Sequence, residues 1–475
     1  MEITRRVDLG EGKGGLSAEI ARVKTQEQGR SSCYVPDSAI LIGGGGHVGQ
    51  KYGPLFVQGG LPVSAVIDTR STDEALSTLP NTQYLQVTDG SSVISCLEEA
   101  LDAHPQAAVF ITTPQGTHID VLEQIAPLVH ARKAPVRIEK PLATNLAELK
   151  QFLALVNDPR REGLLNQMVA GGYTLDKATP ELIALGALPA TDSLIRHIRP
   201  VDPDSPDFAT TYSDPVRNRE SFGDLKRIGF HFHEGRPDIR DVVGGKFGNR
   251  TYLALYPGGG LVSDLTDHVT DKLIALGHLT PDSRLFSTFL GYIPMGIADT
   301  PFPWPVPENE GLAEFHAETT LKTGNVPLVL GWGKRAPQFL GDKRKSTFHF
   351  ENATLSTDYS TNEHGQSNIF SVTTEDTQHS YYLDADPWAL MLKRFRGVWS
   401  NDLPGTARGI YPQVVSTAFQ TDIVNIWKGD PTVLFATDPR HRLRNGGLEA
   451  RHVDKMKRDE KWIRGGHRNS EKTTS

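Results

Sequence analysis

A histidine lies between two acidic residues in the segment 258–271, which reads GGGLVSDLTDHVTD. If this segment is helical, Asp264, His268 and Asp271 fall at positions i, i+4 and i+7 and share one face. One carboxylate could then orient the imidazole while the other faces a substrate, as in an acid–base unit. A buried, hydrogen-bonded histidine flanked by acids is the alternative, and this segment alone leaves both open. Two carboxylates and one histidine at helical spacing match zinc sites poorly, so no metal is predicted.

Lys140 is the second candidate for proton transfer. It stands in the sequence EKP, directly after the apolar run 135–139. Partial burial lowers the pKa of a lysine, and such a lysine can hold a substrate hydroxyl and take or return its proton. A solvated surface lysine is the alternative, but the position between an apolar strand and a proline argues against it.

Four further residues are candidates for lining a substrate site. Tyr173 and Lys177 follow the predicted strand 165–170 near a domain junction; core packing or solvation is the alternative for each. His231 and His233 alternate in IGFHFHEG and therefore point to one face of a strand. Pocket lining is predicted for this pair, because two histidines without further ligands do not make a metal site.

A glycine cluster, LIGGGGHVGQ, follows an apolar run at residues 41–50 and satisfies G-x-G-x-x-G. Gly44 permits a tight strand-to-helix turn, Gly46 lets the backbone approach a pyrophosphate, and Gly49 lets helix and strand pack closely. The start of the helix then offers N–H groups and a positive dipole end to phosphates. The predicted cofactor contacts in this loop are Gly44, Gly46, His47, Val48 and Gly49.

Asp68 ends a second apolar run about twenty residues later, where an acid accepts hydrogen bonds from a ribose 2′-OH. This carboxylate would repel a 2′-phosphate and therefore favours NAD. Arg70 could instead stack on adenine or bind a phosphate, so NADP stays open.

Residues 112–118 read TTPQGTH and follow a predicted strand. A Thr-Pro turn there ends the strand and exposes backbone groups on the side of the glycine loop. An ordinary turn is the alternative to a cofactor contact. The predicted cofactor contacts on this side, together with those of the EKP segment, are Thr112, Thr113, Pro114, His118, Glu139 and Lys140.

Strands and helices alternate between residues 37 and 172, and this alternation must position the candidate residues. The predicted strands are 38–42, 63–67, 84–87, 107–112, 135–139 and 165–170. The predicted helices are 47–57, 92–103, 117–131 and 144–156. Such alternation is typical of a parallel, doubly wound Rossmann sheet, which binds ligands beyond the carboxyl ends of its strands.

After residue 172, strand-like runs follow one another without regular helices between them. They predict a large, mostly antiparallel sheet in an α+β domain. The runs are 251–256, 284–293, 314–322, 327–333, 346–350, 353–357, 368–374 and 379–383. Residues 201–222 and 299–310 are typical of loops, whereas 387–397 and 407–428 have the pattern of amphipathic helices. We therefore divide the chain into a flexible arm (1–36), a dinucleotide-binding domain (37–172), an α+β domain (173–435) and a basic tail (436–475).

Composition excludes several classes of function. Of the 475 residues, 38% are hydrophobic and 23% charged, which is ordinary for a soluble globular protein. No stretch approaches the roughly 18 apolar residues of a membrane span. The net charge of −7 argues against a nucleic-acid-binding protein. Cys33 and Cys96 form no disulfide framework, and no apolar region follows Arg5 and Arg6, so we expect a cytoplasmic protein.

The motifs occur in the order GGGGHVG, AVIDTR, TTPQGTH, EKP and GGGLVSDLTDH-x-x-D. This ordered set resembles the Gfo/Idh/MocA oxidoreductase family, which includes glucose–fructose oxidoreductase and inositol dehydrogenase. The resemblance covers residues 37–435. It implies a Rossmann domain and a second domain whose open sheet mediates oligomerisation and lines the substrate cleft, so a homodimer or homotetramer is expected. It also implies a nicotinamide cofactor and a sugar, polyol or related substrate.

The resemblance assigns roles by position. It implies that Lys140 contacts the substrate and assists proton transfer, that His268 is the acid–base partner, and that Asp264 binds the substrate. Thr266 stands where the family usually has glycine, and Asp267 adds a charge beside the histidine. Both departures bear on the role of His268.

The expected activity is hydride transfer to or from a secondary alcohol or ketone of a sugar-like substrate, with NAD or NADP. One alternative is an NAD-retaining enzyme that cleaves a glycosidic bond through transient oxidation of the sugar. Another is a dinucleotide-binding sensor or structural protein without catalysis. Release of an aglycone without accumulation of NADH would distinguish the glycoside-cleaving enzyme from a dehydrogenase.

Overall fold

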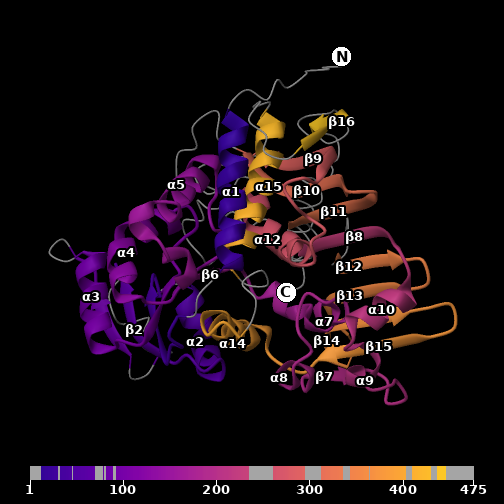
Figure 1. Cartoon of the computed structure of the whole chain (residues 1–475), viewed down its shortest axis with the longest axis horizontal. Coiled ribbons are helices and arrows are strands. Elements are labelled where there is room, and N and C mark those ends of the chain that lie inside the picture. Colours follow the sequence, from indigo (N-terminus) through magenta and orange to yellow (C-terminus); the bar gives the residue numbers. More distant parts are fainter. Residues whose placement is uncertain are drawn as a thin grey trace, which may run out of the picture.

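Two sheets organise the molecule, one of six parallel strands and one of ten mostly antiparallel strands (Figure 1). The predicted fold class, a Rossmann sheet followed by a large open sheet, is thereby confirmed. The computed structural model describes residues 12–29, 33–44, 47–69, 79, 82–88, 92–234, 260–294, 312–334, 343–362, 364–402, 409–428 and 436–445. The predicted strand 251–256 and the predicted loop 299–310 lie outside the described residues.

The six-stranded sheet has the order β3-β2-β1-β4-β5-β6, which is the Rossmann order. Its strands are β1 (Ser38–Ile42), β2 (Val63–Asp68), β3 (Gln83–Gln86), β4 (Ala107–Ile111), β5 (Val136–Ile138) and β6 (Met168–Ala170). The helices that connect them are α2 (His47–Gln58), α3 (Val93–Ala103), α4 (His118–Arg132) and α5 (Leu146–Val156). Side-chain caps fix two of the helix starts: Ser92 and Ser95 form a capping box on α3, and Asn145 caps α5.

Both faces of this sheet are buried, which explains its nearly continuous apolar strands. On one face Ile40 and Ile42 belong to a core shared with α3, α4 and α5. On the other face Leu41 and Phe110 pack against α2 and against α14 (Pro387–Trp399). A helix from the C-terminal part of the chain therefore completes the N-terminal domain.

The ten-stranded sheet has the order β16-β9-β10-β11-β8-β12-β13-β14-β15-β7. Its strands are β7 (Ile198–Pro200), β8 (Leu225–Glu234), β9 (Arg284–Pro294), β10 (Leu312–Thr323), β11 (Val326–Lys334), β12 (Lys343–Phe350), β13 (Thr354–Thr361), β14 (Ser367–Thr373), β15 (Gln378–Leu383) and β16 (Ala436–Asn445). Strand β16 pairs in parallel with β9, so the start of the predicted basic tail belongs to the sheet. The predicted loop 201–222 also contains regular structure, α9 (Phe208–Tyr212) and α10 (Pro215–Phe222), which begin at Asp207 and Asp214 caps.

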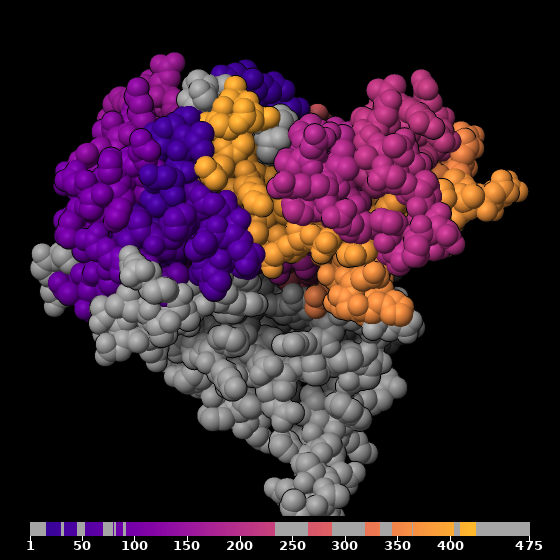
Figure 2. Space-filling model, turned by 90° about the horizontal axis from the view of Figure 1, so that it is seen from below, coloured from indigo at the N-terminus to yellow at the C-terminus, as the bar shows by residue number. Residues whose placement is uncertain are grey.

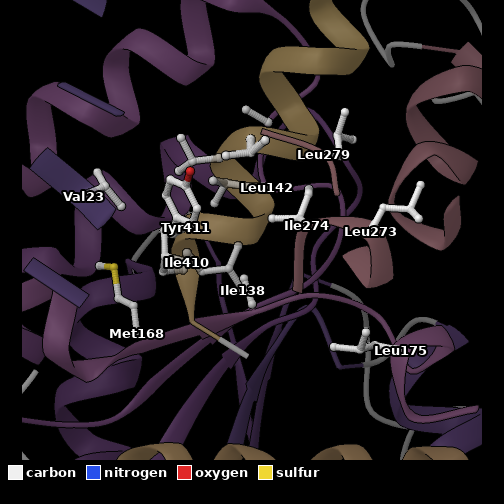
Figure 3. Packing of buried hydrophobic residues seen from close by; sticks show 14 of the residues in the cluster. Val23, Ile138, Leu142, Met168, Leu175, Leu273, Ile274, Leu279, Ile410 and Tyr411 are labelled. Atoms are coloured by element: carbon white, nitrogen blue, oxygen red, sulfur yellow. The ribbon is translucent and has the colours of Figure 1, made fainter. Parts of the chain in front are cut away.

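Helices α12 (Gly260–Ala275) and α15 (Ile410–Lys428) run between the two sheets (Figure 1). Every side chain from 410 to 423 is buried. Figure 3 shows Ile410 and Tyr411 of α15 among side chains of the N-terminal domain, including Ile138, Leu142 and Met168. In the space-filling view, the orange and yellow surface of α14 and α15 separates the indigo N-terminal domain from the magenta part of the second domain (Figure 2).

The flexible arm predicted for residues 1–36 was wrong for its described part. Residues 12–28 form helix α1 (Gly12–Gln28), which packs against α15 and α5. Leu16, Ile20 and Val23 are buried on one helical face because their spacing is i, i+4 and i+7. The carboxylate of Glu27 accepts a hydrogen bond from the backbone N–H of Ile410, at the start of α15.

Candidate active site

The carboxyl edge of the parallel sheet carries the first half of the site. The register pairs the last residues of neighbouring strands with one another, in the order Ile67, Ile42, Ile111, Ile138 and Ala170. The residues that follow them therefore form one row along this edge, on the side where such sheets bind ligands. In strand order the row is Asp68, Gly43, Thr112, Glu139 and Gly171.

Two glycines shape the turn after β1. Gly43 has a φ of +83°, and a Cβ there would lie 2.8 Å from the backbone of Thr113. A Cβ on Gly44 would lie 2.6 Å from Leu41 Cβ, so neither position has room for a side chain. The left-handed conformation in this tight turn therefore falls on Gly43, one residue before the glycine to which the turn was assigned from the sequence. The turn brings bare backbone and the start of α2 to the sheet edge, which suits a pyrophosphate.

Asp68 ends β2 at the same edge and is 8% exposed, as predicted for a ribose ligand. Gly46 and Arg70 lie outside the described residues. For His47, Val48 and Gly49 the structure describes the helical backbone at the start of α2.

His118 braces the two loops that carry Thr113 and Lys140. Its ring nitrogens Nδ1 and Nε2 each lie 2.8 Å from a carbonyl oxygen, of Pro141 and Thr113 respectively. Burial lowers the pKa of this imidazole, although both carbonyls favour its protonated form. Because both ring nitrogens face protein carbonyls, His118 is a structural brace. The cofactor contact at this residue stays a prediction.

Glu139 holds the backbone at Lys140, and its contact with a cofactor stays a prediction. One carboxylate oxygen accepts a hydrogen bond from the Lys140 N–H at 3.2 Å, and the other pairs with the buried Arg137. Burial opposes ionisation, but the positive charge and hydrogen bond of Arg137 outweigh it and lower the pKa of Glu139. Arg137 also donates to Gly171 O at 3.2 Å, so one ion pair ties the ends of β5 and β6 together.

Lys140 and His268 lie on either side of Gly172. A Cβ built on Gly172 would be 3.4 Å from Lys140 Cγ and 3.9 Å from His268 Cε1. The two candidates for proton transfer, which are 128 positions apart in the sequence, thus approach one point beside the carboxyl edge. Lys140 is half-buried, whereas His268 is buried.

His268 is held by the residues that follow β6 and by strand β8. Its Nδ1 lies 2.5 Å from the hydroxyl oxygen of Thr174, at the start of α6 (Thr174–Lys177). Phe232 of β8 stacks on the imidazole with ring centroids 4.9 Å apart, and Tyr173 meets it edge-on at 6.1 Å. The Thr174 hydroxyl therefore contacts Nδ1 of the imidazole, whereas the sequence suggested that a carboxylate orients this ring.

Asp271 points to the backbone of Gly172 instead of the imidazole. Its carboxyl accepts hydrogen bonds from the Gly172 N–H and from Gln413 Nε2, the latter at 2.7 Å. Burial, together with the neighbouring Asp267, raises the pKa of Asp271 well above its usual range. Asp271 therefore fixes the peptide that separates His268 from Lys140.

Tyr173 and Lys177 were both predicted to line the substrate site; Tyr173 contacts the His268 ring, and Lys177 lies over Tyr173. The Lys177 ammonium sits 5.0 Å from the centre of the Tyr173 ring. Tyr173 also stacks on Trp388 of α14 at 6.3 Å. Helix α6, which carries Lys177, is held to α14 by an ion pair at 3.0 Å between Asp176 and Arg394, which are both buried.

Residues 38–161 match the model of a protein family described as an oxidoreductase family with an NAD-binding Rossmann fold, Gfo/Idh/MocA. This match assigns residues 38–161 to the NAD-binding Rossmann domain of that family. The resemblance inferred from the ordered motifs is thereby confirmed, as are an oxidoreductase and a nicotinamide dinucleotide, NAD or NADP, as its cofactor.

Solved structures resemble this oxidoreductase over most of its length. An oxidoreductase from Thermotoga maritima has a TM-score of 0.54 at 12% identity, covering 82% of this chain and 96% of its own. The 3-ketoreductase KijD10 from Actinomadura kijaniata, in complex with NADP and TDP-benzene, has 0.52 at 14% identity, covering 86% and 99%. UDP-N-acetylglucosamine 3-dehydrogenase GnnA from Acidithiobacillus ferrooxidans has 0.50 at 13% identity, covering 83% and 99%. Such identities show the fold alone, and no curated protein matches the chain in sequence.

The remaining predicted residues lie farther from the site or are less fully described. Neighbouring residues of a strand point to opposite faces, so His231 lies on the face of β8 away from His268, which Phe232 contacts. The pocket-lining role predicted for His231 was therefore wrong. For His233 and Asp264 the structure describes the backbone, in β8 and α12.

Two kinds of feature are absent from the described part of the chain. No group of three or more His, Cys, Asp or Glu side chains there could hold a metal ion. Among the same residues, no helix is both long and apolar enough to cross a membrane.

Proposed function

We propose that this chain transfers a hydride between a nicotinamide dinucleotide and a secondary alcohol or ketone of a sugar-like substrate. The observation that carries the proposal is the approach of Lys140 and His268 to one point beside Gly172. This point lies next to Glu139 and Gly171, at the edge where parallel sheets bind dinucleotides.

Two groups of the chain can manage the proton of the substrate hydroxyl. A bound nicotinamide supplies a hydride acceptor for oxidation or a hydride donor for reduction. During oxidation the Nζ atom of Lys140 holds the hydroxyl and the imidazole of His268 takes its proton; during reduction the proton returns. Because the Thr174 hydroxyl contacts Nδ1 of His268, we propose Nε2 as the atom that exchanges the proton.

The chain also offers the groups that would hold the dinucleotide. The glycine turn and the start of α2 suit the phosphates, and Asp68 suits a ribose 2′-OH. This carboxylate favours NAD. A structural neighbour binds NADP, so both dinucleotides belong in the test.

Sugar nucleotides are the first substrates to try. GnnA is named for UDP-N-acetylglucosamine, and KijD10 is a ketoreductase in complex with TDP-benzene. Tyr173 and Lys177 are the proposed sugar contacts, because Tyr173 lies against His268 and Lys177 lies against Tyr173. We further propose a homodimer or homotetramer formed through the ten-stranded sheet, in the cytoplasm.

The test measures dinucleotide binding and turnover separately. NADH and NADPH are titrated by fluorescence, and NADH or NADPH production is followed with UDP-N-acetylglucosamine, UDP-glucose, TDP-glucose, myo-inositol and D-glucose. Lys140→Ala is expected to leave dinucleotide affinity within a few-fold and to abolish turnover. Lys150→Ala is the matched control, because Lys150 is an exposed lysine of the same domain. Unchanged turnover in Lys140→Ala would remove Lys140 from the mechanism.

Two other outcomes would redirect the proposal. Dinucleotide that remains bound through purification, with aglycone release from a p-nitrophenyl glycoside and no accumulation of NADH, would favour glycoside cleavage through transient oxidation. Failure to bind either dinucleotide would refute the proposed hydride transfer.

A further inference from the structure

Gly172 occupies the one point that both proton-transfer candidates approach. Its N–H is fixed by the buried carboxyl of Asp271, and the missing Cβ would point between Lys140 and His268. Among the described residues other than Gly172 and its two chain neighbours, no further heavy atom comes within 4 Å of that Cβ position. The bare backbone at Gly172 therefore leaves a space bounded by the two groups.

Backbone conformation does not explain this glycine. Gly172 is absent from the positions with positive φ, unlike Gly171, whose φ is 105°. The contacts of 3.4 and 3.9 Å that its Cβ would make are ordinary van der Waals distances. At Gly43, by contrast, a Cβ would meet backbone atoms at 2.8 Å. Alanine therefore fits the fold at position 172, and its methyl group would fill the space between Lys140 and His268.

We propose that Gly172 determines substrate specificity: its lack of a side chain makes room beside Lys140 and His268 for a bulky substituent next to the reacting carbon. This inference rests on the proposed function, which places the carbinol carbon between these two groups. A methyl group at this point fills volume that such a substituent needs. A smaller substrate can still bring its hydroxyl to the same two groups.

The experiment compares two substrates that differ in one substituent. UDP-N-acetylglucosamine carries an acetamido group at C2 of the sugar, where UDP-glucose carries a hydroxyl. Gly172→Ala is expected to lower kcat/KM for UDP-N-acetylglucosamine by about 10- to 200-fold, the usual range for one methyl group in a shaped pocket. The value for UDP-glucose is expected to change much less. Affinity for NADH is expected to stay at the wild-type value, because the glycine turn and Asp68 are untouched.

Gly229→Ala is the matched control. Gly229 lies in β8, has no positive φ, and would meet nothing within 4 Å among the described residues if it gained a Cβ. It reports the general effect of adding a methyl to the backbone of the second domain. Both substrates are expected to react with this variant as they do with the wild type.

The outcomes separate this inference from the proposed function. A wild type that turns over neither sugar nucleotide nor any other substrate of the panel refutes both. The inference alone is refuted if the wild type turns over both substrates and Gly172→Ala lowers kcat/KM for both equally, or for neither. Gly172→Ser gives a second side chain at the same point. If both variants melt well below Gly229→Ala, glycine is required by the fold and the inference is wrong.

Discussion

Replacing Thr174 with valine tests whether its hydroxyl holds His268 for proton transfer. Valine keeps nearly the shape of threonine and removes the hydroxyl that lies 2.5 Å from Nδ1 of the ring. Thr174 and His268 are only 4% and 6% exposed, so water has little access to replace the hydroxyl. Removing one partner of a buried hydrogen bond costs about 1–3 kcal/mol. If that cost falls on the productive orientation of the ring, kcat decreases roughly 5- to 150-fold.

The assay is kcat and KM across pH with the best substrate of the panel, beside NADH titration and thermal melting. Thr174→Ser is the control, because it keeps the hydroxyl and removes only a methyl group. We expect Thr174→Ser to stay close to the wild type, and Thr174→Val to lose kcat at unchanged NADH affinity with an altered pH profile. A valine variant with the kcat and pH profile of the wild type would refute the role of Thr174. Equal losses in both variants would point to packing instead of the hydrogen bond.

Two predictions concern the support of the site. Lys272 and Glu181 form a fully buried ion pair at 2.7 Å, so Lys272→Met leaves a buried carboxylate without its cation and is expected to lower the free energy of unfolding by about 3–5 kcal/mol. Urea unfolding checks this, and the double variant Lys272→Met with Glu181→Leu should recover part of the loss. Burial, and then the charge of Arg219, lower the pKa of His278 from 6.5 to about 4. Between pH 6.5 and pH 4, His278 therefore binds a proton in the unfolded chain but stays neutral in the folded chain. Because the unfolded state binds more protons, the free energy of unfolding should fall by ~3 kcal/mol as the pH drops from 6.5 to 4. Urea unfolding at several pH values should show a shallower fall for His278→Gln, and identical slopes would contradict this assignment.

Most of the fold was predictable because its signals are local and periodic. Apolar runs alternating with helical segments predicted the Rossmann domain and its parallel sheet. Helix α1 was missed although its signal was present: Leu16, Ile20, Val23 and Glu27 repeat on one face, but polar composition outweighed that spacing. The strand β16 has no comparable apolar pattern, and its backbone pairing with β9 depends on a neighbour far away in the sequence.

The site was predictable only where a rule connects sequence to position. The carboxyl-edge rule located Lys140, and helical spacing drew attention to His268. The same edge rule assigned His118 and Glu139 to the cofactor, but it did not predict that both would bind groups of the protein, because it locates a residue and does not identify its polar partners. The contact of Thr174 with His268 joins residues 94 positions apart, and distances of that kind leave no periodic trace.

Buried ion pairs stand one residue away from three of the site residues. Glu139 of the pair with Arg137 precedes Lys140, Asp176 of the pair with Arg394 precedes Lys177, and Lys272 of the pair with Glu181 follows Asp271. Desolvating two charges is costly, and such a pair is weak evidence for stability. What each pair does provide is a fixed backbone at its position, because a charge in an apolar interior has few other geometries available. Proton transfer between a lysine, a histidine and a substrate depends on ångström-scale placement. The three pairs are therefore better explained as supports for that placement than as contributions to the free energy of folding.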